Sequence, residues 1–405
     1  MSNSQKLLSS LMVFSCLLLV LNFGLRSSMG FFVTPISDHF GYGREVFAFS
    51  LALQNLCWGL FQPVAGAFAD RFGTYKTLLL GSVVYAAGLY FTSIAESAFG
   101  LHTAAGLLIG MGVAGTGFGV VLPAMARMVA PEKRAMALGL GTAAGSAGQF
   151  LVIPAAQQLI VSFGWQSTLL ILAFGALFML ALAIPLAKDK GGLQLKPEIN
   201  DLTIRQAMSE ATNHVHYWLL IGGFFVCGFQ LAFITVHMPS YLHDKGFDGK
   251  TAVICLSLIG FFNIIGCLLF GNWSGKYSKK NLLGYIYLSR AITIAAFLTY
   301  PISLTSVYLF AIVSGFLWLA TVPVTSGIVA QMFGLKHMGT LFGIVFLNHQ
   351  LGSFLGVWLG GYLFDHTGSY DIVWWSSAII ALITAIIHVF IDERPVTRIR
   401  HAMAS

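Results

Sequence analysis

The sequence has little charge. Only 9% of its 405 residues are Asp, Glu, Lys or Arg, 57% are hydrophobic, and the mean hydropathy is +0.80. A water-soluble domain carries about 25% charged residues. The composition therefore excludes a soluble protein. It predicts an integral membrane protein that is embedded in the lipid bilayer.

Several kinds of site are also missing from the sequence. The five cysteines lie inside apolar runs without C-x-x-C spacing, so we expect neither a disulfide framework nor a metal site. No nucleophile motif or phosphate-binding loop is present, so we expect no enzyme activity and no cofactor. The net charge of +7 comes from short basic clusters between apolar runs, which indicates membrane topology rather than nucleic-acid binding. We expect a monomer.

Twelve apolar runs are each long enough to cross a bilayer, which requires about 20 residues. Their approximate bounds are 7–34, 46–68, 77–95, 101–124, 135–160, 166–187, 214–241, 251–271, 282–300, 305–329, 339–362 and 372–391. If the N-terminus is cytoplasmic, the inside segments hold 17 Lys and Arg residues and the outside segments hold 3. This bias predicts that both termini are cytoplasmic.

The two halves of the chain repeat each other. A shift of 204 residues aligns Gly24 with Gly228, Pro35 with Pro239, Gly139 with Gly343 and Gly148 with Gly352, and a shift of 205 aligns Gly66 with Gly271. Repeated halves are common in transporters whose site opens alternately to each side. We predict an all-α fold of two six-helix bundles, at 1–187 and 214–391, with a cytoplasmic linker at 188–213 and a cytoplasmic tail at 392–405.

The loop between the second and third runs carries a motif, Gly66-x-x-x-Asp70-Arg71-x-Gly73, followed by Lys76. It resembles the signature of the major facilitator superfamily, and a weaker copy with Lys276 lies at the equivalent loop of the second half. An acid beside bases at a helix end can pair with neighbouring helix ends in one state and release them in another. We predict a gating loop that consists of Gly66, Asp70, Arg71, Gly73, Lys76, Arg127 and Lys276.

A narrower resemblance extends over Arg127–Gly148 and from His349 to Asp371. These stretches are similar to the monocarboxylate transporter and oxalate/formate antiporter group, including its bacterial members. The resemblance implies a secondary transporter of small organic anions in a bacterial inner membrane. The first-span aromatic signature of the animal members and the Asp/Arg pair or lone Arg of the eighth span are absent, so the mechanism of those relatives does not carry over unchanged.

The predicted spans contain cations but no carboxylate. All fifteen acids fall in loops or at span edges, whereas Arg26, Arg290, His237, His349 and His388 lie within spans. An ionisable group inside a span is costly unless it faces a cavity or a partner. A cavity lined in this way favours an anion, because guanidinium binds carboxylate through two parallel hydrogen bonds.

Arg26 is the main candidate for binding the anion, with Asn22 one turn earlier on the same face. The alternative is that Arg26 extends to the outer interface. Arg290 lies about 12 Å along its helix from the cytoplasmic end, and a structural role competes equally with a functional one. Gln230 and His237 share a face of the seventh span, and Asn348 and His349 lie in the eleventh.

His237 and His349 are the candidates for proton coupling, since imidazole titrates near neutral pH; each could instead be a core residue. Asn55, Gln149, Asn263 and Trp318 complete the predicted substrate-binding residues. We predict a transporter that moves a small organic anion by proton symport or anion exchange, and a monocarboxylate is the favoured substrate. The alternatives are a proton-coupled exporter of drugs or metabolites, which would be expected to bury a carboxylate, and a membrane sensor that does not transport.

Overall fold

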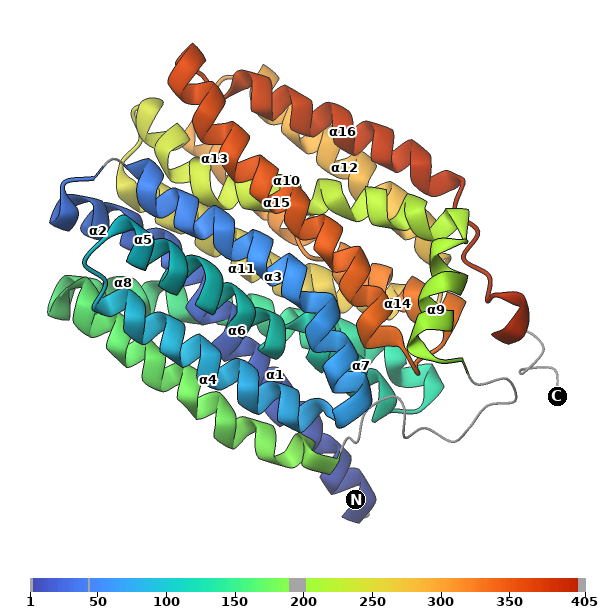
Figure 1. Cartoon of the computed structure of the whole chain (residues 1–405). Coiled ribbons are helices and arrows are strands. Elements are labelled where there is room, and N and C mark those ends of the chain that lie inside the picture. Colours follow the sequence, from blue (N-terminus) through green and yellow to red (C-terminus); the bar gives the residue numbers. More distant parts are fainter. Residues whose placement is uncertain (1–2, 43, 189–201, 400–405) are drawn as a thin grey trace.

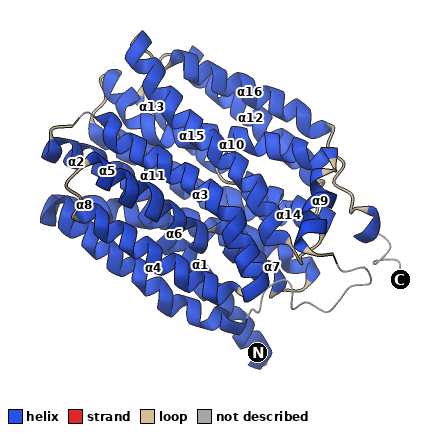
Figure 2. Cartoon of the chain, in the orientation of Figure 1, coloured by secondary structure: helices blue, strands red, loops and turns tan. Residues whose placement is uncertain are grey.

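The computed structural model describes residues 3–42, 44–188 and 202–399, and the regular elements in these ranges are helices (Figures 1 and 2). The long helices run side by side through one bundle. Both chain ends and the short helix α9 (Ile204–Thr212) lie at the same end of this bundle, which we call the terminal end. The opposite end carries connections between helices, including the short helix α2 (Val33–Phe40).

The N-terminal half consists of the helices up to residue 188. Their bounds are α1 (Asn3–Ser28), η1 (Met29–Phe32), α2 (Val33–Phe40), α3 (Arg44–Phe72), α4 (Thr74–Ser93), α5 (Ala98–Leu101), η2 (His102–Leu108), α6 (Ile109–Thr116), α7 (Phe118–Arg127), η3 (Pro131–Lys133), α8 (Arg134–Ala183) and η4 (Ile184–Lys188). Helix α8 turns a corner at Gly164, whose φ of 77° is accessible to glycine without strain. It therefore contains two of the predicted spans.

The C-terminal half follows α9. Its helices are α10 (Val215–Asp244), α11 (Gly249–Ser274), α12 (Lys279–Thr299), α13 (Leu304–Leu317), α14 (Thr321–Phe333), α15 (Met338–Thr367) and α16 (Asp371–Val389). Helices α13 and α14 together form the tenth predicted span, which is interrupted at 318–320. Pro323 explains this interruption, because it has no N–H to donate to the carbonyl of Leu319 and its ring crowds that carbonyl.

The predicted twelve-helix membrane fold is confirmed. Nine helical stretches of the described chain are long and apolar enough to cross a membrane, and one of them, Pro131–Ala187, contains two spans. The two remaining predicted spans, 46–68 and 77–95, coincide with α3 and α4, which have 29 and 20 residues. The predicted boundaries of the bundles, linker and tail stay predictions, and 189–201 of the linker and 400–405 of the tail lie outside the described residues.

The two halves meet along two helix pairs, α3 with α15 and α8 with α11. Figure 1 shows α3 and α15 crossing the middle of the bundle together. Glycines make both contacts close at the terminal end. A Cβ added to Gly66 would lie 2.4 Å from the carbonyl oxygen of Gly339, and one added to Gly271 would lie 2.6 Å from Cα of Gly139. Backbone contacts of this kind exclude any larger residue.

The close contacts use residues that the sequence repeat pairs. Gly66 and Gly271 are equivalent under the repeat, and so are Gly139 and Gly343. Helix α3, with Gly66, packs on the helix of Gly343, and Gly271 packs on Gly139. The α3–α15 and α11–α8 contacts are therefore two versions of one packing arrangement.

Substitution of Gly271 tests the close contact. Gly271→Leu forces α8 and α11 apart at the terminal end, and we expect a loss of about 1–3 kcal/mol, as for overpacked cores. The measurement is the melting temperature of the purified protein in detergent. Gly222→Leu is the matched control, because a Cβ at Gly222 meets nothing within 4 Å. Equal melting temperatures for the two variants would contradict the packing described above.

Candidate functional site

Arg26 points into the bundle from α1. Its Nη2 donates to Oδ1 of Asn55 on α3, and its guanidinium carbon lies 4.8 Å from the centre of the Trp58 ring. Its Nε is buried and has no hydrogen-bond partner among the described residues. The charge of Arg26 is therefore met by an amide oxygen and an aromatic face, and one of its donors is left over.

Asn22 lies one turn before Arg26 and is fully buried. Its Nδ2 donates to Oγ1 of Thr116, the last residue of α6, and its backbone carbonyl accepts a hydrogen bond from the Tyr85 hydroxyl at 3.2 Å. Oδ1 of Asn22 is buried and has no hydrogen-bond partner among the described residues. The predicted neighbours Asn22, Arg26 and Asn55 are thus brought together, and each of Asn22 and Arg26 has an unused polar atom.

A row of rings leads from Arg26 into the C-terminal half. The Trp58 ring lies 4.8 Å from that of Phe346 on α15, and Phe346 stacks on the imidazole of His349 at 5.0 Å and 14°. His349 is 5% exposed, and neither ring nitrogen has a partner in the described part of the chain. His349 also lies within electrostatic reach of both Arg26 and Arg290.

A second polar cluster surrounds the interruption in span ten. Arg290 donates from Nη2 to the carbonyls of Leu317 and Trp318, and from Nη1 to Oε1 of Gln230 at 3.4 Å. Oδ1 of Asn263 accepts from the backbone N–H of Leu319 at 2.9 Å. The predicted residues Gln230 and Trp318 thus meet at Arg290, and Asn263 bonds the same interruption at Leu319, all in the C-terminal half.

Three predicted residues lie apart from these clusters. Nε2 of His237 donates to the carbonyl of Val357 at 2.8 Å, and its ring packs beside Tyr370. Asn348 donates to the carbonyl of Ile221 at 2.9 Å. Gln149 is buried in α8. His237 and Asn348 join α10 to α15, so their observed contacts are within the C-terminal half. Their assignment to substrate or protons stays a prediction.

Sequence reasoning missed three polar residues beside the predicted ones. Tyr85 and Thr116 bond Asn22, and Gln350 has a fully buried amide with no partner for either polar atom among the described residues. An amide in an apolar span is a signal that could have identified Gln350. Thr116 carries no such signal, because a threonine hydroxyl often bonds its own helix, as that of Thr116 also does. Tyr85 carries none because most of its side chain is apolar.

The predicted gating loop closes the terminal end between the halves. Oδ2 of Asp70, at the end of α3, accepts from the backbone N–H and the hydroxyl of Thr340, both at 3.1 Å. Thr340 is in the first turn of α15, where the helix dipole favours a negative charge. Arg127 donates from Nη1 to Oδ1 of Asp70 at 3.4 Å and from Nη2 to Thr74 at 3.3 Å. Asp70 therefore joins α3, α7 and α15.

The other residues of the loop have different surroundings. Gly73 begins α4 with φ 94°, a conformation that favours glycine. Arg71, Lys76 and Lys276 are exposed at the terminal end, with Arg71 against the ring of Phe72. The structure thus places Gly66 and Asp70 in the contact between the halves, whereas the three bases face outward.

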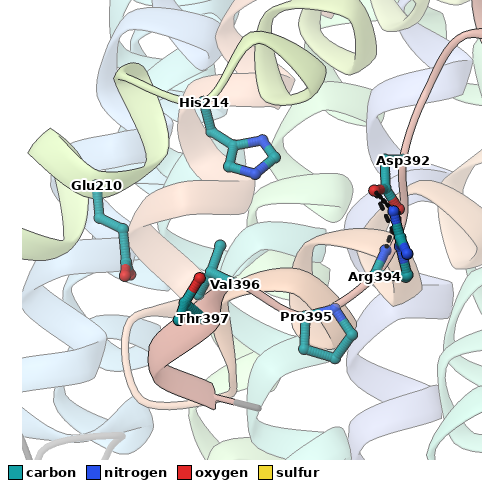
Figure 3. Close-up of a pocket in the computed structure, with 7 residues that line it drawn as sticks. All are labelled: Glu210, His214, Asp392, Arg394, Pro395, Val396 and Thr397. Carbon is teal, nitrogen blue, oxygen red and sulfur yellow. Dashed lines mark hydrogen bonds and ion pairs between the residues drawn. The ribbon is translucent and has the colours of Figure 1, made fainter. Parts of the chain in front are cut away.

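The terminal end also has a pocket of about 260 Å³ between the linker helix and the tail. Figure 3 shows Glu210 and His214 on one side and the bonded pair Asp392 and Arg394 on the other. Hydrogen bonds from Arg394 hold the pKa of the Asp392 carboxyl well below its usual range. Beyond the pocket, Arg398 of the tail pairs with Glu210 at 3.2 Å. The tail is thereby fastened to α9.

The described residues include no group of three or more His, Cys, Asp or Glu side chains that could hold a metal ion. The buried polar atoms without hydrogen-bond partners among the described residues belong to amide, imidazole, guanidinium, hydroxyl and indole groups. Most of these groups can donate a hydrogen bond, which suits an acceptor such as an oxyanion.

Comparison with known proteins identifies relatives along the whole chain. The family model described as Major Facilitator Superfamily matches residues 15–357. The uncharacterized MFS-type transporter YcxA of Bacillus subtilis (strain 168) is 25% identical over 393 residues, which cover 93% of this chain and 94% of that protein. Monocarboxylate transporter 13 of Rattus norvegicus is 26% identical over 317 residues, which cover 76% and 71%.

Solved structures share the fold. The proton:xylose symporter XylE matches with a TM-score of 0.74 at 15% identity, covering 96% of this chain and 97% of that one. The fucose:proton symporter FucP of E. coli matches with a TM-score of 0.66 at 14% identity, covering 94% and 98%. At these identities the likeness extends to the architecture alone.

Substitution of Asp70 tests the closed terminal end. Asp70→Asn removes the charge from the hydrogen bonds to Thr340 and Arg127, and we expect a loss of about 1.5–3 kcal/mol, the contribution of a hydrogen bond to a charged group. The melting temperature measures this loss. Glu96→Gln, at an exposed acid, is the control. If both variants melt at the wild-type temperature, Asp70 does not hold the halves together.

Proposed function

Because the chain belongs to the major facilitator superfamily of membrane transporters, we propose that it moves a small organic anion across a bacterial inner membrane. The proposal rests above all on Arg26. Its guanidinium lies inside the bundle, its partners in the described chain include no carboxylate, and one of its donors has no partner. A buried charge of this kind is costly until an anion joins it.

The geometry around Arg26 suits a carboxylate. A guanidinium offers donors in a planar fork that matches the two oxygens of this group. A substrate carboxylate could replace the amide oxygen of Asn55 as the acceptor for Nη2 of Arg26 and so balance the charge. Nε of Arg26 has no partner among the described residues and could donate to the second carboxylate oxygen. The rings of Trp58 and Phe346 supply an apolar wall beside it. This combination favours a monocarboxylate with an apolar portion, and the relatives named as monocarboxylate transporters support the same class.

The transport cycle that we propose is alternating access. In the observed state the terminal end is closed by Asp70, Thr340 and the glycine contacts. The bias of basic residues supports a cytoplasmic location for this end. Opening to the cytoplasm requires that Asp70 leave the first turn of α15 and that the two glycine contacts separate.

We include His349 in the proposed binding site, beside Arg26 and the apolar wall of Trp58 and Phe346. Its two ring nitrogens are free of partners in the described chain, and it lies within electrostatic reach of Arg26. A neutral imidazole can donate a hydrogen bond to a carboxylate or accept a proton that arrives with it. His237 is a weaker candidate, because its Nε2 already bonds Val357.

Substitution of Arg26 tests the cargo class. In proteoliposomes with labelled monocarboxylates, we expect Arg26→Ala to abolish uptake and Arg26→Lys to raise KM by about 100-fold, because a charge-assisted bidentate pair is lost. Correct folding is checked by the melting temperature and by the yield of the monodisperse protein.

The control is Arg205→Ala, which removes a positive charge from an exposed position on α9. We expect wild-type uptake in this variant. Wild-type uptake in Arg26→Ala would refute the assignment of Arg26, and a wild-type protein that takes up none of the tested organic anions would refute the substrate class.

The two coupling modes predict different results in the same vesicles. In electroneutral proton symport, an external pH one unit below the internal pH supports an about tenfold accumulation of the anion. We expect His349→Gln to abolish this accumulation. In anion exchange, uptake requires an anion loaded inside the vesicles and does not depend on the pH gradient. Measuring accumulation with and without each gradient distinguishes the modes.

A further inference from the structure

Arg290 differs from Arg26 in the kind of group that balances its charge. Nη2 of Arg290 donates to the carbonyl of Leu317 at 2.7 Å and also to that of Trp318. Leu317 is the last residue of α13, so these carbonyls lack the donors that a continuous helix would supply. The end of a helix also carries about half a negative charge. The guanidinium is thus partly balanced by a helix end.

The same interruption is held from a second helix. Asn263 of α11 accepts the N–H of Leu319 at 2.9 Å, so carbonyls and an N–H that the break frees are bonded by side chains of other spans. Gln230 is in turn fixed by its Nε2, which donates to the carbonyl of Ser377 at 3.0 Å. This directs its Oε1 toward Arg290. Arg290 therefore belongs to a network that holds residues 318–320 in one conformation.

The N-terminal half has a corresponding interruption between α6 and α7, and the side chains that bond it are uncharged. Helix α6 ends at Thr116, where Gln62 donates to the carbonyl of Ala114 at 3.1 Å and Asn22 donates to Thr116. Arg26 makes no hydrogen bond to a backbone carbonyl of the described chain that would hold this break. A shift of 205 residues places Tyr85 at the position of Arg290. Only the C-terminal half thus uses a guanidinium at its broken span.

The space beside Arg290 is too small for an anion. A cavity of about 10 Å³ is lined by Arg290, Gln230 and Trp318 with apolar side chains of α10 and α12. Such a cavity accommodates about one water molecule. Both the occupied donors of Arg290 and the lack of space argue against direct contact with cargo in this state.

We propose that Arg290 is a positioning residue, which caps the C-terminal end of α13 and holds the break of span ten, and that it does not bind the transported anion. The proposal deepens the proposed function, because it leaves Arg26 as the arginine that binds the cargo. A relative movement of α13 and α14 must then break the bonds of Arg290 to Leu317 and Trp318. Loss of these bonds should impair the rate of transport rather than the affinity.

Two native cysteines report on the break without any cargo. Sγ of Cys227 lies 3.1 Å from the hydroxyl of Thr321 at the start of α14, and Sγ of Cys267 donates to Oδ1 of Asn263 at 3.2 Å. Both thiols are buried. In a protein in which Cys16, Cys57 and Cys255 are replaced by alanine, alkylation by N-ethylmaleimide measures how often this region opens.

In this background we expect Arg290→Gln to raise the alkylation rate about tenfold, the change expected when a hydrogen bond to a charged group is lost. Arg26→Gln should leave the rate unchanged. This readout does not depend on which anion is carried, so a failure of the proposed substrate class leaves it interpretable. An unchanged alkylation rate in Arg290→Gln would overturn the proposal.

Uptake distinguishes positioning from binding. We expect Arg290→Gln to lower Vmax about tenfold while KM stays within about threefold of wild type, the reverse of the effect at Arg26. An about tenfold rise in KM at unchanged Vmax would show that Arg290 binds cargo and would overturn the proposal.

Two further variants complete the experiment. Thr293→Val is the control on the same helix, because the Thr293 hydroxyl bonds only the carbonyl of Ser289, and we expect wild-type alkylation and uptake. If Arg290→Gln does not reach the membrane, Arg290→Lys carries the test: it keeps the charge but loses the planar fork, and we expect an about threefold rise in alkylation. No rise in that variant would also contradict the capping role.

Discussion

The structure depends on how the positive side chains Arg26 and Arg290 are balanced inside an apolar bundle, since their hydrogen-bond partners among the described residues include no carboxylate. Arg290 is balanced by the carbonyl end of α13, whereas Arg26 has only the amide oxygen of Asn55 and the face of Trp58. A helix end provides fixed partial charge that the folded chain always holds, and an amide with an aromatic ring provides less. This difference underlies the proposal that Arg290 serves the fold and that Arg26 binds the cargo.

The buried acid at the terminal end follows the same rule with the opposite sign. Asp70 accepts hydrogen bonds from the first turn of α15, and Arg127 supplies its ion pair. The beginning of one helix thus binds the acid, and the end of another binds the base. Because these partners belong to helices that separate in the proposed transport cycle, the charges would also restrain that movement.

The backbone contacts between the halves complete this picture. Gly66 against Gly339 and Gly271 against Gly139 bring helices of opposite halves together where the ion pair lies. Lipid supplies no hydrophobic force between helices, so small residues and polar groups decide where spans approach. The sequence repeat therefore has a direct structural meaning: the equivalent glycines Gly66 and Gly271 both lie at close backbone contacts, in α3–α15 and α8–α11.

The sequence by itself determined the architecture, since hydropathy, basic-residue bias and the glycine repeat are local properties that survive without knowledge of packing. It also identified Arg26 and Asp70 as charges in unusual places. Only the tertiary structure decided which partner each polar side chain meets. Gln230 and His237 share one helix face, yet Gln230 contacts Arg290 and His237 contacts Val357, because different helices pass that face at different depths. For Arg290 the sequence left two roles open. The carbonyls that it bonds are those freed by the interruption of span ten, and they come beside Arg290 only in the packed bundle.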